Sequence, residues 1–116
     1  MIGIASRNGY KEIIEGICIK TISYGENSLM VEFMFEKGSS IPEHKHINEQ
    51  TGYLVKGSIR LYIDGKAHEF YPGDSWTIRP NVTHRAEIIE DSVAVEVFSP
   101  RREDYIIYEY KEDILE

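Results

Sequence analysis

The chain contains a single cysteine, Cys18, and therefore cannot form an internal disulfide bond. Cys18 lies in an apolar run over residues 17–19, where we expect it to act as a small buried hydrophobic side chain. No apolar run approaches the length of a membrane span, and the N-terminal region lacks the basic and apolar segments of a signal peptide. These absences predict a cytoplasmic protein with no membrane partner.

Positive charge is also scarce, with 13 Lys and Arg residues against 20 Asp and Glu residues and a net charge of −7 at pH 7. No stripe of Lys and Arg is available for a phosphate backbone, so we expect no nucleic-acid partner. At 116 residues, with 41% hydrophobic and 28% charged residues, the chain has the length and composition of one globular domain with one core.

Sustained helical periodicity is missing from most of the chain. Short strand-like runs separated by turn signals instead predict an all-β sandwich or barrel. Residues 38–42 are expected to form a loop before the first histidines, while residues 9–16 and 105–115 are ambiguous, the latter fitting a strand, a short helix or a docking tail. The expected strands cover residues 17–24, 29–36, 53–63, 75–79, 84–89 and 93–98.

The pair Asp64-Gly65 predicts a two-residue β-hairpin, because both residue types tolerate positive φ. The register of that hairpin sets Arg60 opposite Glu69, which adds an opposite-charge pair across the two strands. It also sets Tyr62 opposite Ala67.

Four side chains predict a metal site: His44, His46, Gln50 and His84. Side chains repeat every two residues on a strand, so His44 and His46 should point to the same side of one strand. Gln50 is an even step further and can join them if the strand bends back. Three imidazoles and an amide oxygen form a neutral ligand set for a divalent cation, and zinc, nickel, iron(II), manganese and copper suit it to differing degrees.

Two neighbouring candidates fit the site less well than these four. Glu49 would point inward only if the strand slipped by one residue and exposed its core face, so Gln50 is the expected ligand. His68 lies outside both histidine segments, and we expect it to be structural or partly exposed.

A carboxylate and an aromatic ring share one face of the last clear strand. In residues 93–98 the valines Val93, Val95 and Val97 alternate with Ala94, Glu96 and Phe98. A buried Glu96 needs a cation or a hydrogen bond, which Arg102 beyond the Ser99-Pro100 turn could supply. The alternative is that Glu96 faces solvent. Outward valines would suit burial against a second copy of the chain.

Two motifs carry a resemblance to the cupin superfamily of small double-stranded β-helix, jelly-roll-like barrels. The first runs from Gly38 through His44-Lys45-His46 and Gln50 to Gly57, and the second runs from Pro72-Gly73-Asp74 to His84. The resemblance covers about residues 28–99. It implies that residues 1–116 form a single cupin domain, with an N-terminal strand region over 1–27 and a C-terminal tail over 100–116.

Residues 96–105 read Glu-Val-Phe-Ser-Pro-Arg-Arg-Glu-Asp-Tyr, which is similar to the segment Asp-Val-Phe-Ser-Pro-x-Arg-x-Asp-Phe of KdgF-like cupins. Asn48-Glu49-Gln50 followed by Tyr53 also resembles that family. Such proteins act in pectin and alginate degradation and convert 4,5-unsaturated monouronates to linear keto-uronates. The family usually has Asp where this chain has Glu96, and often has a histidine after the metal-binding pair, where Ile47-Asn48 stands here.

This second resemblance implies an isomerase that acts on a small anionic, sugar-derived molecule in the barrel cavity. The implied metal ligands are His44, His46, Gln50 and His84, and the implied catalytic residues are Glu96, Phe98 and Arg102. A homodimer with exchanged N-terminal strands is implied as well. Two other functions stay open: a metal-dependent dioxygenase, because three-histidine sites can perform oxygen chemistry, and a non-catalytic cupin that binds a small anionic ligand.

Overall fold

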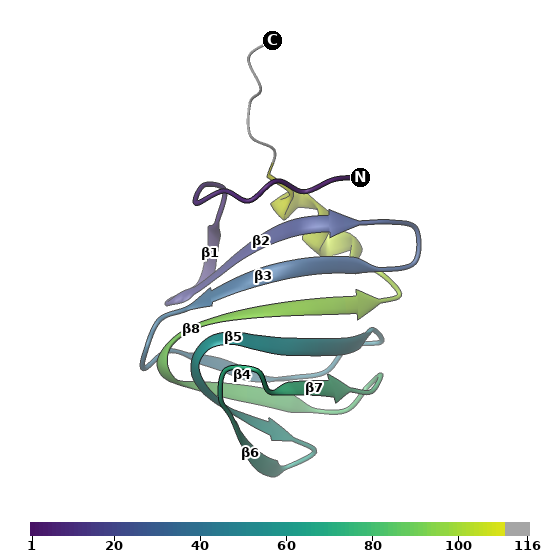
Figure 1. Cartoon of the computed structure of the whole chain (residues 1–116). Helices are drawn as coiled ribbons and strands as arrows, with labels where there is room; N and C mark the ends of the chain where they lie inside the picture. The colour runs from purple at the N-terminus through teal and green to yellow at the C-terminus, as the bar shows by residue number, and fades with distance from the viewer. Residues whose placement is uncertain (111–116) are drawn as a thin grey trace.

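The strands of this protein form one antiparallel sheet that curls into a barrel. The computed structural model describes residues 1–110, and within them the sheet follows the path β1-β2-β3-β8-β5-β6, with β4 beside β8 and β7 beside β5 (Figure 1). The prediction of an all-β jelly-roll-like barrel is confirmed. The strands are β1 (Lys11–Ile14), β2 (Ile17–Tyr24), β3 (Leu29–Phe35), β4 (Ser40–His44), β5 (Glu49–Ile63), β6 (Lys66–Phe70), β7 (Ser75–Ile78) and β8 (His84–Ser99).

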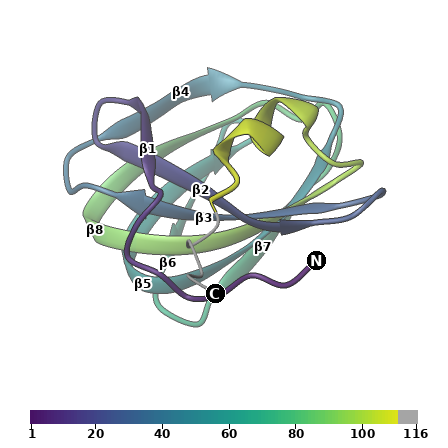
Figure 2. The ribbon, with the colours of Figure 1, turned by 90° about the horizontal axis from the view of Figure 1, so that it is seen from above.

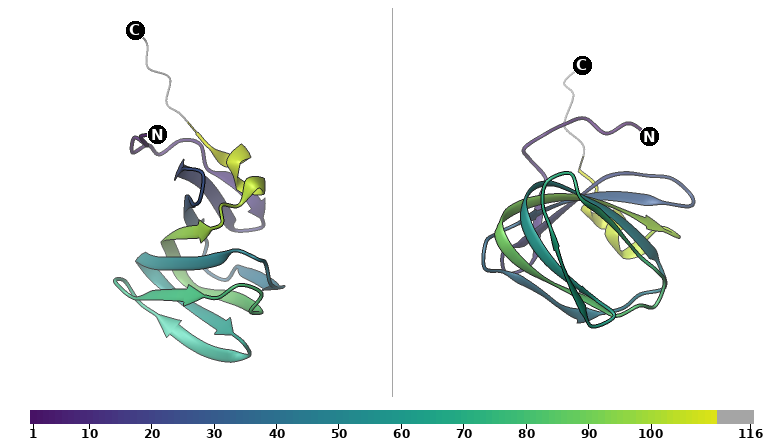
Figure 3. Two further views of the ribbon diagram at one scale, coloured as in Figure 1. Left: turned by 90° about the vertical axis from the view of Figure 1, so that its right-hand side faces the viewer. Right: turned by 60° about the horizontal axis from the view of Figure 1, so that its bottom comes forward.

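Two long curved strands hold the barrel together. β5 pairs with β7 along its first half and with β6 along its second half, whereas β8 pairs first with β4 and then with β3 (Figure 3). β5 and β8 also pair with each other, with register shifts between Leu54 and Ile59. Gly57 has φ +93° at this corner, and a Cβ there would lie 2.1 Å from Ser92 Oγ, so the bend requires glycine.

The core lies inside the barrel and follows the alternation of the strands. Most inward positions on β2, β3, β5 and β8 are apolar, since a strand presents every second residue to one face. These side chains include Ile17, Ile19, Leu29, Val31, Phe33, Phe35, Leu54, Ile59, Leu61, Ala86, Ile88 and Ala94.

The predicted hairpin between β5 and β6 is confirmed. Asp64 has φ 52° and Gly65 has φ 76°, as a two-residue turn of this type requires. Arg60 is the register partner of Glu69, and Arg60 Nη2 lies 2.7 Å from Glu69 Oε1. Tyr62 is paired with Ala67.

Three expectations for the local structure were wrong. The predicted loop over residues 38–42 contains most of β4, and the two strands predicted over 84–89 and 93–98 are one continuous strand, β8. Glu90 and Asp91 between them are exposed, because they pass the corner at Gly57 rather than leave the sheet. Cys18 is half-buried on the outer face of β2 instead of lying in the core.

The ambiguous segments at the two ends take different structures. Residues 9–16 contain β1, which pairs with β2 of the same chain. The 3-10 helix η1 (Glu103–Tyr108) forms the first part of the ambiguous C-terminal stretch and packs against β2 (Figure 2). The remainder of that stretch, beyond residue 110, lies outside the described residues. Within residues 1–110, no helix has the length and apolar character needed to cross a bilayer.

Candidate metal centre

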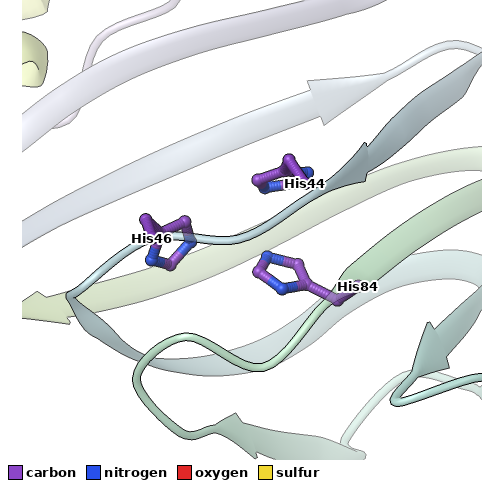
Figure 4. Close-up of side chains that lie close together, drawn as sticks. All are labelled: His44, His46 and His84. Carbon is purple, nitrogen blue, oxygen red and sulfur yellow. The ribbon is translucent and has the colours of Figure 1, made fainter.

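Three histidine rings converge at one end of the barrel (Figure 4). His44 ends β4, His46 lies in the β4–β5 connection, and His84 begins β8, where it is the register partner of His44. Their candidate ligand atoms all lie within 4.8 Å of one another. The expectation that His44 and His46 share one strand was wrong, because β4 stops at His44 and the connection turns the second ring back towards the first.

Backbone hydrogen bonds fix which nitrogen of each ring is free to bind a metal. In each histidine, Nδ1 lies 2.8–2.9 Å from a main-chain carbonyl oxygen two residues away, which only a protonated nitrogen can satisfy. Each neutral ring therefore carries its lone pair on Nε2. The carbonyls belong to Pro42 for His44, Asn48 for His46 and Val82 for His84.

His84 Nε2 is the observation that tests whether a cation fits. This atom is buried and has no hydrogen-bond partner among the described residues. A buried polar atom without a partner is unfavourable, and this one faces the two other imidazoles. A divalent cation bound to the three rings would satisfy it, so the residues present fit a metal.

Gln50 supplies a fourth donor from the second residue of β5. Its amide oxygen Oε1 lies 3.0 Å from His46 Nε2, and its amide nitrogen donates to Glu96 Oε1 over 2.6 Å. Because His46 Nδ1 holds the ring proton, the 3.0 Å contact brings two electron-pair donors together. That spacing suits two ligands of one ion, each about 2.1 Å from it.

Burial keeps the imidazoles of His46 and His84 neutral. Desolvation lowers the pKa of His84 to about 4 and, together with the charge of Arg102, lowers the pKa of His46. A neutral imidazole is the form that coordinates a metal. Neither ring has to lose a proton before it binds a cation at neutral pH.

Glu96 points into the barrel, and it is only 5% exposed. Its Oε1 accepts hydrogen bonds from Gln50 Nε2 and, over 2.9 Å, from Trp76 Nε1. Burial raises its pKa, against the opposing effect of these hydrogen bonds and of Arg102. Sequence reasoning missed Trp76. The available signal was the alternation of residues 75–78, which turns Trp76 and Ile78 inward.

Arg102 lies near Glu96 but is paired with another carboxylate. Its Nε and Nη2 donate to the two oxygens of Asp104, at 3.2 and 2.7 Å. Its guanidinium carbon lies 5.3 Å from the ring centre of Phe98 and 4.0 Å from that of Tyr105. The expected partnership of Arg102 with Glu96 is therefore a longer-range electrostatic effect, while Gln50 and Trp76 supply the hydrogen bonds.

A cavity of about 80 Å³ joins these side chains. It is lined on its polar side by His44, His84, Gln50, Glu96 and Arg102, and elsewhere by core residues. His44 is exposed whereas His84 is buried, so the histidine cluster extends from the surface to the interior. His68 is exposed on β6 and is not part of the cluster found among the described residues.

The antiparallel barrel and the histidine cluster at one end of it are the arrangement found in the cupin class. Residues 31–99 match the cupin domain family, which covers more than half of the chain.

Individual relatives place the chain more narrowly. It is 32% identical over 99 residues to the pectin degradation protein KdgF of Dickeya dadantii, covering 84% of this chain and 90% of the relative. The solved structure of KdgF from Halomonas sp. superposes with a TM-score of 0.85 at 27% identity, over 90% of this chain and 96% of that one. An RmlC-like cupin from Shewanella frigidimarina also gives 0.85 at 26% identity, over 90% and 94%. The chain belongs to the cupin family and, within it, to the KdgF-like proteins.

Proposed function

We propose that this protein is a metal-dependent isomerase that opens the ring of a 4,5-unsaturated uronate to give the linear keto-uronate. The observation that carries the proposal is a buried carboxylate, Glu96, hydrogen-bonded to Gln50 beside three convergent histidines. Support also comes from the relationship to the pectin degradation protein KdgF. The substrate is a cyclic enol ether with an anomeric hydroxyl and a carboxylate.

The metal would be held by Nε2 of the three histidines and by Oε1 of Gln50. A divalent cation supplies Lewis-acid chemistry there, polarising an oxygen of the substrate and stabilising negative charge that develops on it. All four ligands are neutral, so the full charge of the ion is retained for the substrate.

Glu96 would move the proton. Its Oε1 holds two hydrogen bonds, while its Oε2 has no hydrogen-bond partner among the described residues and is available to the substrate. As a general base it takes the proton of the anomeric hydroxyl, C1 becomes an aldehyde, and the bond from C1 to the ring oxygen breaks. As a general acid it returns the proton to C4, which leaves a ketone at C5. No atom is gained or lost.

Arg102 and Phe98 would position the ring. The paired Asp104 uses Nε and Nη2 of Arg102, which leaves Nη1 for the carboxylate of the substrate. The ring of Phe98 lies 5.7 Å from that of His46 and provides an apolar wall beside the metal ligands. Since His44 is exposed, a bound sugar would extend from the cavity towards solvent.

The test is an assay of metal-loaded protein with an unsaturated monouronate, following the ultraviolet absorbance of its double bond. We expect loss of absorbance well above the rate in buffer, and a decrease of about 10²- to 10⁴-fold in Glu96→Gln, which cannot exchange the proton. His68→Ala, at an exposed histidine outside the cluster, is the matched control and should keep full activity.

Three other results would contradict the proposal. Wild-type protein no faster than buffer would overturn the reaction. Uronate binding that is equal in wild type and Glu96→Gln, without turnover in either, would identify a binding protein. Oxygen uptake by the iron-loaded protein, with no turnover under anaerobic conditions, would identify an oxygenase.

A further inference from the structure

Three strands bring Trp76, Gly52 and Glu96 into one row across the inside of the barrel. Gly52 on β5 is the register partner of Trp76 on β7 and also of Glu96 on β8. The next row along places Gln50 between Ile78 and Phe98. Gln50 and Gly52 are two residues apart on β5, so they face the same side, and Glu96 is a diagonal neighbour of Gln50.

The missing side chain of Gly52 makes room for the indole of Trp76. A Cβ at position 52 would lie 2.2 Å from Trp76 Cε2 and 2.3 Å from Trp76 Nε1. The indole therefore occupies the space over β5 that a side chain would fill, and its N–H reaches across β5 to Glu96 on β8. Trp76 is 7% exposed, and both ends of this hydrogen bond are buried.

The chemistry of the indole fixes the direction of the next hydrogen bond. Trp76 Nε1 can only donate, so the oxygen that receives it, Glu96 Oε1, acts as an acceptor. Gln50 shares that same oxygen and must present its NH₂ group to it. With its NH₂ group held by Glu96, the Gln50 amide turns its other atom, Oε1, towards His46 Nε2.

We infer that Trp76 is a positioning residue for the metal centre: through Glu96 it holds the amide of Gln50 with its oxygen turned towards the metal ligands. A free glutamine amide has two nearly isosteric orientations, and only one offers oxygen to a cation. Partners that orient a metal ligand contribute about 10- to 100-fold to metal affinity. This inference rests on the proposed metal centre but not on the proposed reaction.

The experiment measures the affinity of the apo-protein for Co²⁺ alone, by competition with a chromophoric chelator and from the visible spectrum of bound cobalt. Trp76→Phe keeps an aromatic ring and removes the N–H, and Gly52→Ala removes no polar group but places a Cβ in the space of the indole. We expect each to weaken cobalt binding by about 10- to 100-fold and to change the cobalt spectrum. Thr77→Val, on the outward face of β7, is the matched control and should leave both unchanged.

A measurement on the unaltered protein covers the case in which a variant does not fold. Trp76 is the only tryptophan in the chain, so its indole N–H gives one unambiguous resonance. We expect this resonance to shift when Zn²⁺ is added to the apo-protein.

The outcomes separate this role from the metal centre itself. Wild type that binds cobalt, with Trp76→Phe and Gly52→Ala indistinguishable from Thr77→Val, would overturn the role of Trp76 and leave the metal centre standing. An indole resonance unmoved by bound Zn²⁺ would overturn it too. Wild type that binds neither ion would overturn the metal centre and this role with it.

Discussion

The two halves of β8 differ on their outer face, which is charged in the first half and apolar in the second. In the first half, Ala86 and Ile88 face the core while Arg85 and Glu87 form an ion pair on the outside. In the second half a carboxylate, Glu96, faces inward and three valines are partly exposed on the outside: Val93, Val95 and Val97. Burying a carboxylate and exposing valines each raise the free energy of the folded state of an isolated barrel. We propose that the second half is shaped by a ligand that binds inside the barrel and by a second chain that covers its outer face.

The largest expected effect is a loss of metal affinity when the first residue of β8, which faces inward, is substituted. His84→Ala removes a proposed metal ligand whose Nε2 faces the other two rings. Removing a residue that only orients a ligand lowers metal affinity about 10- to 100-fold. We expect removal of the ligand itself to lower metal affinity by more than about 100-fold. Titration of apo-protein with Zn²⁺ measures this, and His68→Ala should bind as wild type does. Equal affinity in His84→Ala and wild type would show that the histidines do not hold the metal.

Metal binding should also stabilise the folded barrel. A cation that binds only the native state adds about 2.7 kcal/mol when its free concentration is about 100 times the Kd, or about 10 °C in midpoint for a domain of this size. Thermal unfolding with and without a chelator measures the difference. The same comparison in His84→Ala should show almost no effect of the chelator. If the unfolding midpoint of the wild type changes with neither metal nor chelator, the folded state does not form a metal site.

Local signals in the sequence predicted most strands, because each depends on short-range alternation and turn chemistry. The Asp64-Gly65 hairpin with its Arg60–Glu69 pair is the clearest case. β4 was missed because Pro42 and its neighbours look like a loop, although proline is acceptable in a strand that pairs on one side. The continuity of β8 was missed because a bend at an exposed polar segment gives the same local pattern as a turn.

The candidate site was harder to predict where it depends on register between distant strands. The strand period alone put Glu96 and Phe98 on one face, and the structure buries both. The link from Trp76 to Glu96 across Gly52 requires the pairing of three strands, which no single segment reveals. The partner of Arg102 depends on η1, whose first turn supplies Asp104, and the sequence pattern left that segment ambiguous.

The outer valines of β8 give the next prediction, that of a homodimer. Val95 is paired with Tyr53 of β5, which is 50% exposed, so apolar surface continues across the two strands. A lysine at position 95 would place two like charges in a symmetric interface without partners. We expect light scattering to give the mass of two chains for wild type, and a Kd at least about 10-fold weaker for Val95→Lys. Val95→Thr, similar in shape, is the control for packing.

Metal affinity should be the same in the Val95→Lys variant, because Val95 faces away from the cavity. A monomeric wild type would remove the proposed reason for the exposed valines. The exchange of N-terminal strands stays a prediction. A dimer that survives deletion of residues 1–14, which include β1, would argue against a role of this strand in dimer formation.

The smallest effect, a change in stability, is expected from a substitution on the outer face of the first half of β8. Glu87 accepts hydrogen bonds from both Arg60 and Arg85, at 3.1 and 3.0 Å, and these partners lower its pKa, with Arg85 the larger cause. A carboxyl whose pKa is lower in the folded state stabilises that state above its unfolded pKa, and this contribution disappears as the pH falls through the folded pKa. Glu87→Gln should therefore lower the unfolding midpoint slightly at neutral pH, less at high salt, and not at all in acid. A loss as large as that caused by metal removal, or one that persists in acid, would mean that this face is not the solvated surface inferred from its alternation.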